Sequence, residues 1–102
     1  MKLFKPVDKK LAEIGFIRVE DADDEAIVDY RRVNKKNGYT QRLELIYREG
    51  GHHIALSYNR EIHNRKHVND TPVGLTMYEM LLCVAKMREI GWTTKKPKRK
   101  KA

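Results

Sequence analysis

The longest helical pattern in the chain runs from Leu75 to Trp92, where apolar residues recur at spacings of three and four. Thr76 and Glu79 have the spacing of a capping box, in which each residue's side chain accepts a hydrogen bond from the other's backbone N–H. Gly91 supplies the left-handed residue that ends many helices, and Trp92 follows it in the position that folds back onto the last turn. The pattern therefore predicts a helix that begins at Thr76 and ends before Gly91.

One face of this helix is expected to be buried against the rest of the domain. It consists of Met77, Met80, Leu81, Val84 and Met87, with Cys83 and Ile90 on its flank. The opposite face is mostly polar and consists of Tyr78, Glu79, Lys86 and Glu89, with Leu82 as an apolar exception. Because methionine side chains adapt to many shapes, the alternative to a core-facing stripe is a groove that binds a partner.

Between residues 27 and 59 the pattern becomes typical of strands, with β-branched and aromatic residues in the first and strict alternation in the second, which predicts an antiparallel meander. Ile27 to Asn34 and Tyr39 to Arg48 are the first two long strands, and Asn37-Gly38 between them is a strong hairpin signal. A turn at Glu49-Gly50-Gly51 then leads to a third strand, His52 to Asn59. The residues expected on the inner face are Leu43, Leu45, Tyr47, Ile54, Leu56 and Tyr58.

A shorter helix and a short strand precede the meander. Pro6 suits a first helical turn, the apolar stripe Val7, Leu11 and Ile14 follows it, and Gly15 ends the helix. Phe16 to Val19 is predicted to be a short strand. The predicted fold is therefore α+β: a three- or four-stranded antiparallel meander with two helices packed on one face, in the order α-β-β-β-β-α or α-β-β-β-α.

The outer face of the meander is expected to carry Arg31, Arg42, Glu44, Arg48, His53, Ser57 and Asn59. Its three arginines, with Arg32, Lys35 and Lys36 at the hairpin end, are candidate ligands for nucleic-acid phosphates. The alternative is a solvated face on which Glu44 and Asp29 pair with neighbouring arginines.

Two polar segments are candidate partner-binding regions. The acidic run at residues 20–25, with Asp21, Asp23, Asp24 and Glu25, suits a basic partner, but it lacks the Gly and distal Glu of a calcium-binding loop. Residues 60–74 are predicted to be irregular and contain His63, Arg65, Lys66 and His67. Although His63 and His67 have a metal-ligand spacing, no carboxylate or cysteine completes a set, so we expect no metal and no cofactor.

The formal net charge of +8 is concentrated at the C-terminal end. Six of the last eight residues are basic: Lys95, Lys96, Lys98, Arg99, Lys100 and Lys101. This segment has no apolar residue to dock it, and Pro97 interrupts helix formation. We therefore expect one domain over residues 1–92 and a disordered basic tail over residues 93–102, which also resembles a nuclear localisation signal.

Several functional classes are disfavoured by the sequence. We find no phosphate-binding glycine loop and no nucleophile motif, so we do not expect an enzyme. The single cysteine, Cys83, lies on an apolar flank with no base nearby and is expected to be a buried hydrophobe. No apolar run reaches the length of a membrane span, and the first residues lack a secretion signal, which predicts a cytoplasmic protein without a membrane partner.

Two resemblances add to this picture. The predicted order of helix, three strands and helix is similar to double-stranded RNA-binding domains, but the lysines with which that family contacts phosphates are missing from the helix start at Leu75-Thr76-Met77-Tyr78. The segment from Leu75 to Trp92, with the pattern L-T-x-x-E-M and then K-M-x-E-I-G-W, resembles small accessory proteins of phages and prophages of Gram-positive bacteria. That resemblance implies a bacterial host cytoplasm and a role in binding nucleic acid or disabling host proteins, including CRISPR nucleases.

The sequence therefore supports two hypotheses for a non-catalytic binding module. In the first, the basic tail and the sheet arginines Arg31, Arg42 and Arg48 bind nucleic acid in a salt-sensitive manner. In the second, the chain is an inhibitor or adaptor that binds a host protein through the acidic run, residues 60–74 and an exposed Leu82. The sequence does not distinguish DNA, RNA and protein as the partner, and it leaves the oligomeric state open.

Overall fold

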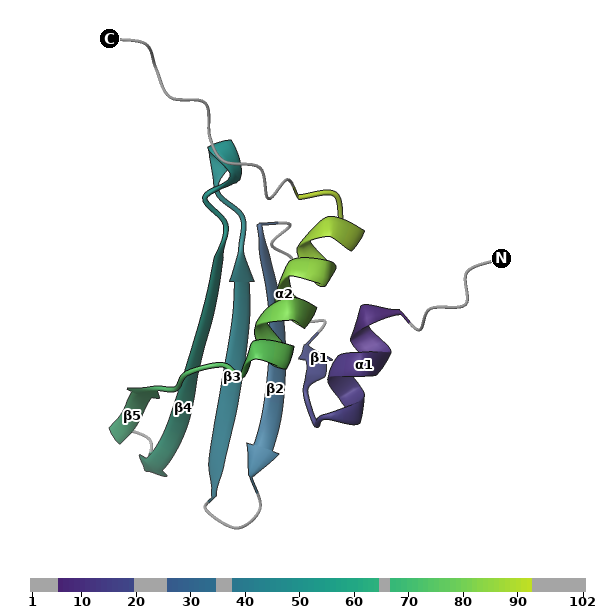
Figure 1. The fold of residues 1–102 in the computed structure, drawn as a ribbon. Helices are drawn as coiled ribbons and strands as arrows, with labels where there is room; N and C mark the ends of the chain where they lie inside the picture. Colours follow the sequence, from purple (N-terminus) through teal and green to yellow (C-terminus); the bar gives the residue numbers. More distant parts are fainter. Residues whose placement is uncertain (1–5, 20–25, 35–37, 65–66, 93–102) are drawn as a thin grey trace, which may run out of the picture.

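The computed structural model describes residues 6–19, 26–34, 38–64 and 67–92, without the side chains of residues 62–64 and 67. The elements are α1 (Val7–Glu13), β1 (Ile17–Val19), β2 (Ile27–Asn34), β3 (Tyr39–Ile46), a 3-10 turn (Glu49–Gly51), β4 (Ile54–Asn64), β5 (His67–Pro72) and α2 (Met77–Glu89). They form one antiparallel sheet with two helices that lie side by side (Figure 1). The predicted α+β class is confirmed.

Within the described ranges the sheet has five strands in the order β1-β2-β3-β4-β5, each antiparallel to its neighbours, so the predicted number of three or four was too low. The additional strand comes from residues 60–74, which extend β4 to Asn64 and then form β5 instead of an irregular segment. The sequence of β5 is mostly polar, so no alternation of apolar and polar residues predicts this strand. Arg60 and Asp70 face each other across β4 and β5 and form a two-pronged ion pair with N–O distances of 2.8 and 2.9 Å.

The core lies between one face of the sheet and the two helices. Its buried apolar side chains come from all these layers: Leu11, Phe16, Val28, Tyr30, Leu43, Leu45, Leu82, Cys83 and Met87. The β2–β3 register pairs Val28 with Leu45 and Tyr30 with Leu43, so alternate residues of both strands point into the same core. The inward orientation predicted for Leu43 and Leu45 is therefore correct.

The face predicted for β4 was wrong. Ile46 pairs with Ile54 and Leu45 pairs with Ala55, so Ala55 and Ser57 face the core side while Ile54, Leu56 and Tyr58 face away from it. Alternation shows that a strand has two different faces, but the pairing register decides which face meets the helices. Ser57, predicted to be solvent-facing, is consequently buried and accepts a hydrogen bond from Gln41 Nε2 at 2.9 Å.

The two ends of α2 lie where the sequence predicts them, but the helix is rotated about its axis so that a different face is buried. The Thr76–Glu79 capping box is present, Gly91 has a φ of 88°, and the Trp92 N–H donates to the Met87 carbonyl oxygen at 2.7 Å. The buried residues of α2 are nevertheless Glu79, Leu82, Cys83, Lys86 and Met87. Met77 and Leu81, expected in the core, are 74% and 63% exposed, whereas Leu82 is only 5% exposed.

Candidate functional site

The three arginines predicted to bind phosphates do not form one stripe. Arg31 and Arg42 are direct cross-strand neighbours on β2 and β3 and face away from the core. Arg48 follows β3 and is six residues after Arg42, which corresponds to about 20 Å of extended chain. Its backbone N–H donates to His53 Nδ1 at 3.0 Å. The predicted tail residues 95–101 lie outside the described residues.

The residues predicted to bind a protein partner are mostly not described. Asp21, Asp23, Asp24, Glu25, Arg65 and Lys66 fall outside the described ranges. His63 lies in β4 and His67 in β5, so these two histidines belong to strands and not to an irregular loop. In the part of the chain that the structure describes, no group of three or more potential metal ligands is present. Leu82, the predicted exposed contact, is buried.

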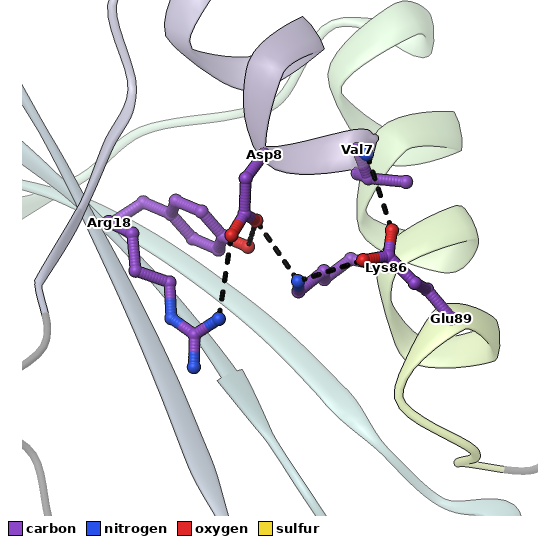
Figure 2. A network of polar contacts seen from close by, with 6 residues as sticks. Val7, Asp8, Arg18, Lys86 and Glu89 are labelled. Carbon is purple, nitrogen blue, oxygen red and sulfur yellow. Dashed lines mark hydrogen bonds and ion pairs between the residues drawn. The ribbon is translucent and has the colours of Figure 1, made fainter. Parts of the chain in front are cut away.

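A partly buried ionic network, with only the Lys86 side chain fully buried among its charged members, joins α1, β1, β2 and α2 (Figure 2). Lys86, only 3% exposed, lies 3.1 Å from Asp8 Oδ1 and 3.3 Å from Glu89 Oε1. Tyr30 donates a short hydrogen bond to Asp8, and Arg18 lies 3.5 Å from the same carboxylate. Partial burial raises the pKa of Asp8, but the Tyr30 hydroxyl, Lys86 and Arg18 outweigh this effect and hold the pKa below its usual value. Perturbed groups often mark active sites, yet here each charge has a partner, so the network stabilises the helix–sheet packing.

A second polar network is centred on Arg32, which the sequence had placed among the candidate phosphate ligands. Its guanidinium lies 3.0 Å from Glu79 Oε2 and donates to Ile14 O at 3.1 Å and to Gln41 Oε1 at 2.6 Å. The guanidinium also lies 4.1 Å from the centre of the Phe16 ring. Arg32 is therefore occupied by contacts between the two helices and the sheet.

Three aromatic side chains gather where β3, β4 and the end of α2 meet. Tyr47 stacks on His53 with ring centres 4.8 Å apart, and Trp92 lies 5.4 Å from Tyr47 and 5.3 Å from His53. The three residues are here called the aromatic cluster. Tyr47 is 42% exposed, and its backbone N–H is fixed by the Ala26 carbonyl oxygen at 2.7 Å. The sequence had assigned Tyr47 to the core and had identified no exposed aromatic group of this kind.

An apolar groove lies beside the aromatic cluster, between α2 and β4. It has a volume of about 330 Å³ and is lined by Gly51, His53, Ala55, Met80, Cys83, Val84 and Met87. The exposed side chains of Met77 and Leu81 lie on the same side of α2 as Met80 and Val84. We call this surface the α2 groove. Its position follows from the rotation of α2, which leaves part of the methionine stripe outside the core.

Comparison with protein families, with curated proteins and with solved structures finds no significant match to this chain. The described helices include none with the length and apolar character needed to cross a membrane. Over the residues that the structure describes, the class of the protein is α+β: a five-stranded antiparallel sheet with two helices.

Proposed function

We propose that this chain is a non-catalytic module that binds single-stranded nucleic acid. The observation that carries the proposal is the position of the aromatic cluster. Its last member, Trp92, is followed directly by the ten-residue segment that contains six lysines and arginines. Proteins that hold single strands without sequence preference combine cationic side chains for the phosphates with aromatic rings for the bases.

The two parts have different roles. Tyr47 offers the exposed ring on which a base can stack, while His53 and Trp92 hold that ring in place. The hydrogen bond from the Arg48 N–H to His53 Nδ1 orients the imidazole, so little side-chain entropy is lost on binding. The basic segment supplies affinity, and neutralising six phosphates predicts a slope of about −4 for log K against log salt on a single strand.

The test is a salt titration of labelled single-stranded DNA and RNA by fluorescence anisotropy, with the full-length protein. Tyr47→Ala is expected to weaken binding about tenfold, because stacking on one aromatic contributes on the order of 1–3 kcal/mol per base. Tyr78→Ala is the matched control, since Tyr78 is 49% exposed on α2 and lies about 20 Å from the Trp92 end of the helix.

The contribution of the basic segment is tested separately with the triple variant Lys95→Gln, Lys96→Gln and Lys98→Gln. Loss of three phosphate contacts should reduce the salt slope by about 2. If Tyr47→Ala binds as tightly as the wild type, the aromatic cluster has no role in binding. If the wild type fails to bind any single strand at low salt, the proposed function is wrong.

The α2 groove favours a second candidate function, the binding of an apolar segment of a partner protein. Its lining is mostly apolar, with His53 as the polar member, and it continues into exposed Met77 and Leu81. The resemblance to phage accessory proteins implies a host protein as the partner, for example a CRISPR nuclease.

Cross-linking and mass spectrometry of complexes formed in a bacterial lysate test this second candidate. Specific partner cross-links near α2 should disappear in Leu81→Asp and persist in Ala12→Asp, the same kind of change at an exposed position of α1. Cross-links that persist in both variants would place the partner elsewhere on the molecule.

A further inference from the structure

The sheet has a second face that neither described helix covers. We call it the open face; it consists of the residues that alternate with the core-facing ones in β1 to β5. Its apolar members include four residues that are each more than 40% exposed: Ile17, Val33, Leu56 and Val68. Ile27, Ile46 and Ile54 form a further apolar row across β2, β3 and β4. An exposed sheet face this rich in apolar residues is typical of an interaction surface.

On β2 and β3, the charged residues of the open face are sorted into two neighbouring rows of opposite sign, while Arg60 and Asp70 pair with each other further along the face. Asp29 and Glu44 pair across β2 and β3, and Leu56 continues this acidic row on β4. Two positions away, toward the C-terminal end of β2 and the N-terminal end of β3, Arg31 and Arg42 pair in the same way, and Tyr58 continues the basic row. The two rows are therefore about 7 Å apart along the strand direction.

The charges in these rows are incompletely compensated within the described part of the chain. Asp29 Oδ1 and Arg42 Nε are shielded from solvent, and neither has a hydrogen-bond partner there. Glu44 accepts a hydrogen bond from the Tyr58 hydroxyl at 3.3 Å and makes no ion pair with either arginine among the described contacts. Like charges directly opposite each other, such as Arg31 and Arg42, destabilise a sheet. A surface of complementary charge placed on this face would offset the repulsion within the pairs Arg31–Arg42 and Asp29–Glu44.

We propose that the open face binds a second copy of this chain, forming a symmetric dimer. A two-fold axis that runs across the strands, between the acidic and the basic row, reverses the strand direction and exchanges the two rows. Asp29 then lies opposite Arg31 of the second copy, and Glu44 lies opposite Arg42 of the second copy. The two sheets stack as an aligned sandwich about 10 Å apart, with Leu56 opposite Tyr58 of the other copy.

A second copy fits this face better than nucleic acid does. A phosphate backbone attracted by Arg31 and Arg42 would also meet Asp29 and Glu44, which repel it. A copy of the same face instead presents each row with its opposite charge, which is the self-complementarity that a two-fold interface requires.

The proposal is tested by analytical ultracentrifugation of the full-length protein over a range of concentrations and salt. The wild type should form a concentration-dependent dimer that weakens as salt rises. The first variant, Asp29→Lys with Glu44→Lys, makes both rows basic, and the second, Arg31→Glu with Arg42→Glu, makes both rows acidic. Each variant alone should dimerise at least about tenfold more weakly, because like charges then meet across the interface.

Mixing the two variants gives the sharpest result. Every contact between a wholly basic face and a wholly acidic face is attractive, so the mixture should form a one-to-one heterodimer although neither variant dimerises alone. Lys9→Glu with Arg88→Glu, on exposed positions of α1 and α2, is the matched control and should dimerise like the wild type.

Folding of each variant is checked by circular dichroism. The single changes Asp29→Lys and Arg31→Glu form a milder pair for the same mixing experiment if a double variant unfolds. A wild type that stays monomeric at all concentrations overturns the proposal, and so does a dimer that is unaffected in both charge variants. If the wild type is monomeric and binds an oligonucleotide, and if Arg31→Glu abolishes that binding, the open face is a nucleic-acid site instead.

Discussion

At the scale of single residues, Lys86 depends on its partners because its amine is almost entirely removed from water. Asp8→Asn would leave that charge with Glu89 alone, at 3.3 Å. We predict that this variant lowers the free energy of unfolding by about 1–2 kcal/mol, a value below that of a fully buried pair because Asp8 is 38% exposed. Urea denaturation measures the change, and Lys9→Ala, an exposed neighbour on α1, should alter stability by less than about 0.5 kcal/mol.

The same carboxylate makes stability depend on pH. The pKa of Asp8 is lower in the folded protein than its ordinary value of 3.8, so folding favours the ionised form. The ionised Asp8 therefore makes its full contribution to the free energy of unfolding at pH values above its ordinary pKa of 3.8. This contribution is lost as the pH falls through the lowered pKa of the folded protein. Urea curves at pH 6 and pH 3 should show the difference between wild type and Asp8→Asn shrinking at the lower pH. A difference that stays constant would mean that the ionisation of Asp8 does not stabilise the fold.

At the scale of elements, the buried face of α2 in the structure differs from the face that its apolar periodicity predicts. Leu82→Ala is expected to cost about 2–4 kcal/mol of stability, because Leu82 belongs to the core cluster. Leu81→Ala, one residue earlier and 63% exposed, should change stability by less than about 0.5 kcal/mol. The apolar stripe of the sequence predicts the reverse order, so thermal or urea denaturation of this pair decides between the two faces.

The rotation of α2 also has a physical explanation in its polar residues. Glu79 points toward Arg32 on β2, at 3.0 Å, and Lys86 points toward Asp8 on α1, at 3.1 Å. Buried charges are tolerated only when they are paired, and the partners of Glu79 and Lys86 lie on other elements. The sequence of α2 alone therefore does not show that the face with Glu79 and Lys86 is the inner one. The α2 groove and the exposed methionines follow from the same choice.

At the scale of the whole molecule, Cys83 reports on the integrity of the fold. Its side chain is 2% exposed, and burial followed by the nearby Glu79 charge raises the pKa of the thiol to about 11. At pH 8 only about one thiol in a thousand is ionised, so we predict slow reaction with a disulfide reagent in the native protein. The rate should rise steeply through the urea transition, together with the loss of circular dichroism signal. Fast labelling without denaturant would show that the α2 groove admits the reagent to Cys83.

The sequence by itself determined the features that depend on neighbouring residues. These include the capping box of Thr76 and Glu79, the end of α2 at Gly91, the hairpin near Gly38, and the positions of β2 and β3. Such signals are local because a cap or a turn needs only a few residues with the right backbone and side-chain chemistry.

The tertiary structure alone decided which faces meet. The strand register turned Leu56 outward, and the ion pairs of Glu79 and Lys86 turned Leu81 outward. The aromatic cluster likewise exists only because Trp92 comes to lie against Tyr47, a residue 45 positions earlier in the chain. Contacts between distant segments depend on the summed packing of all layers, and no local pattern in the sequence carries that information.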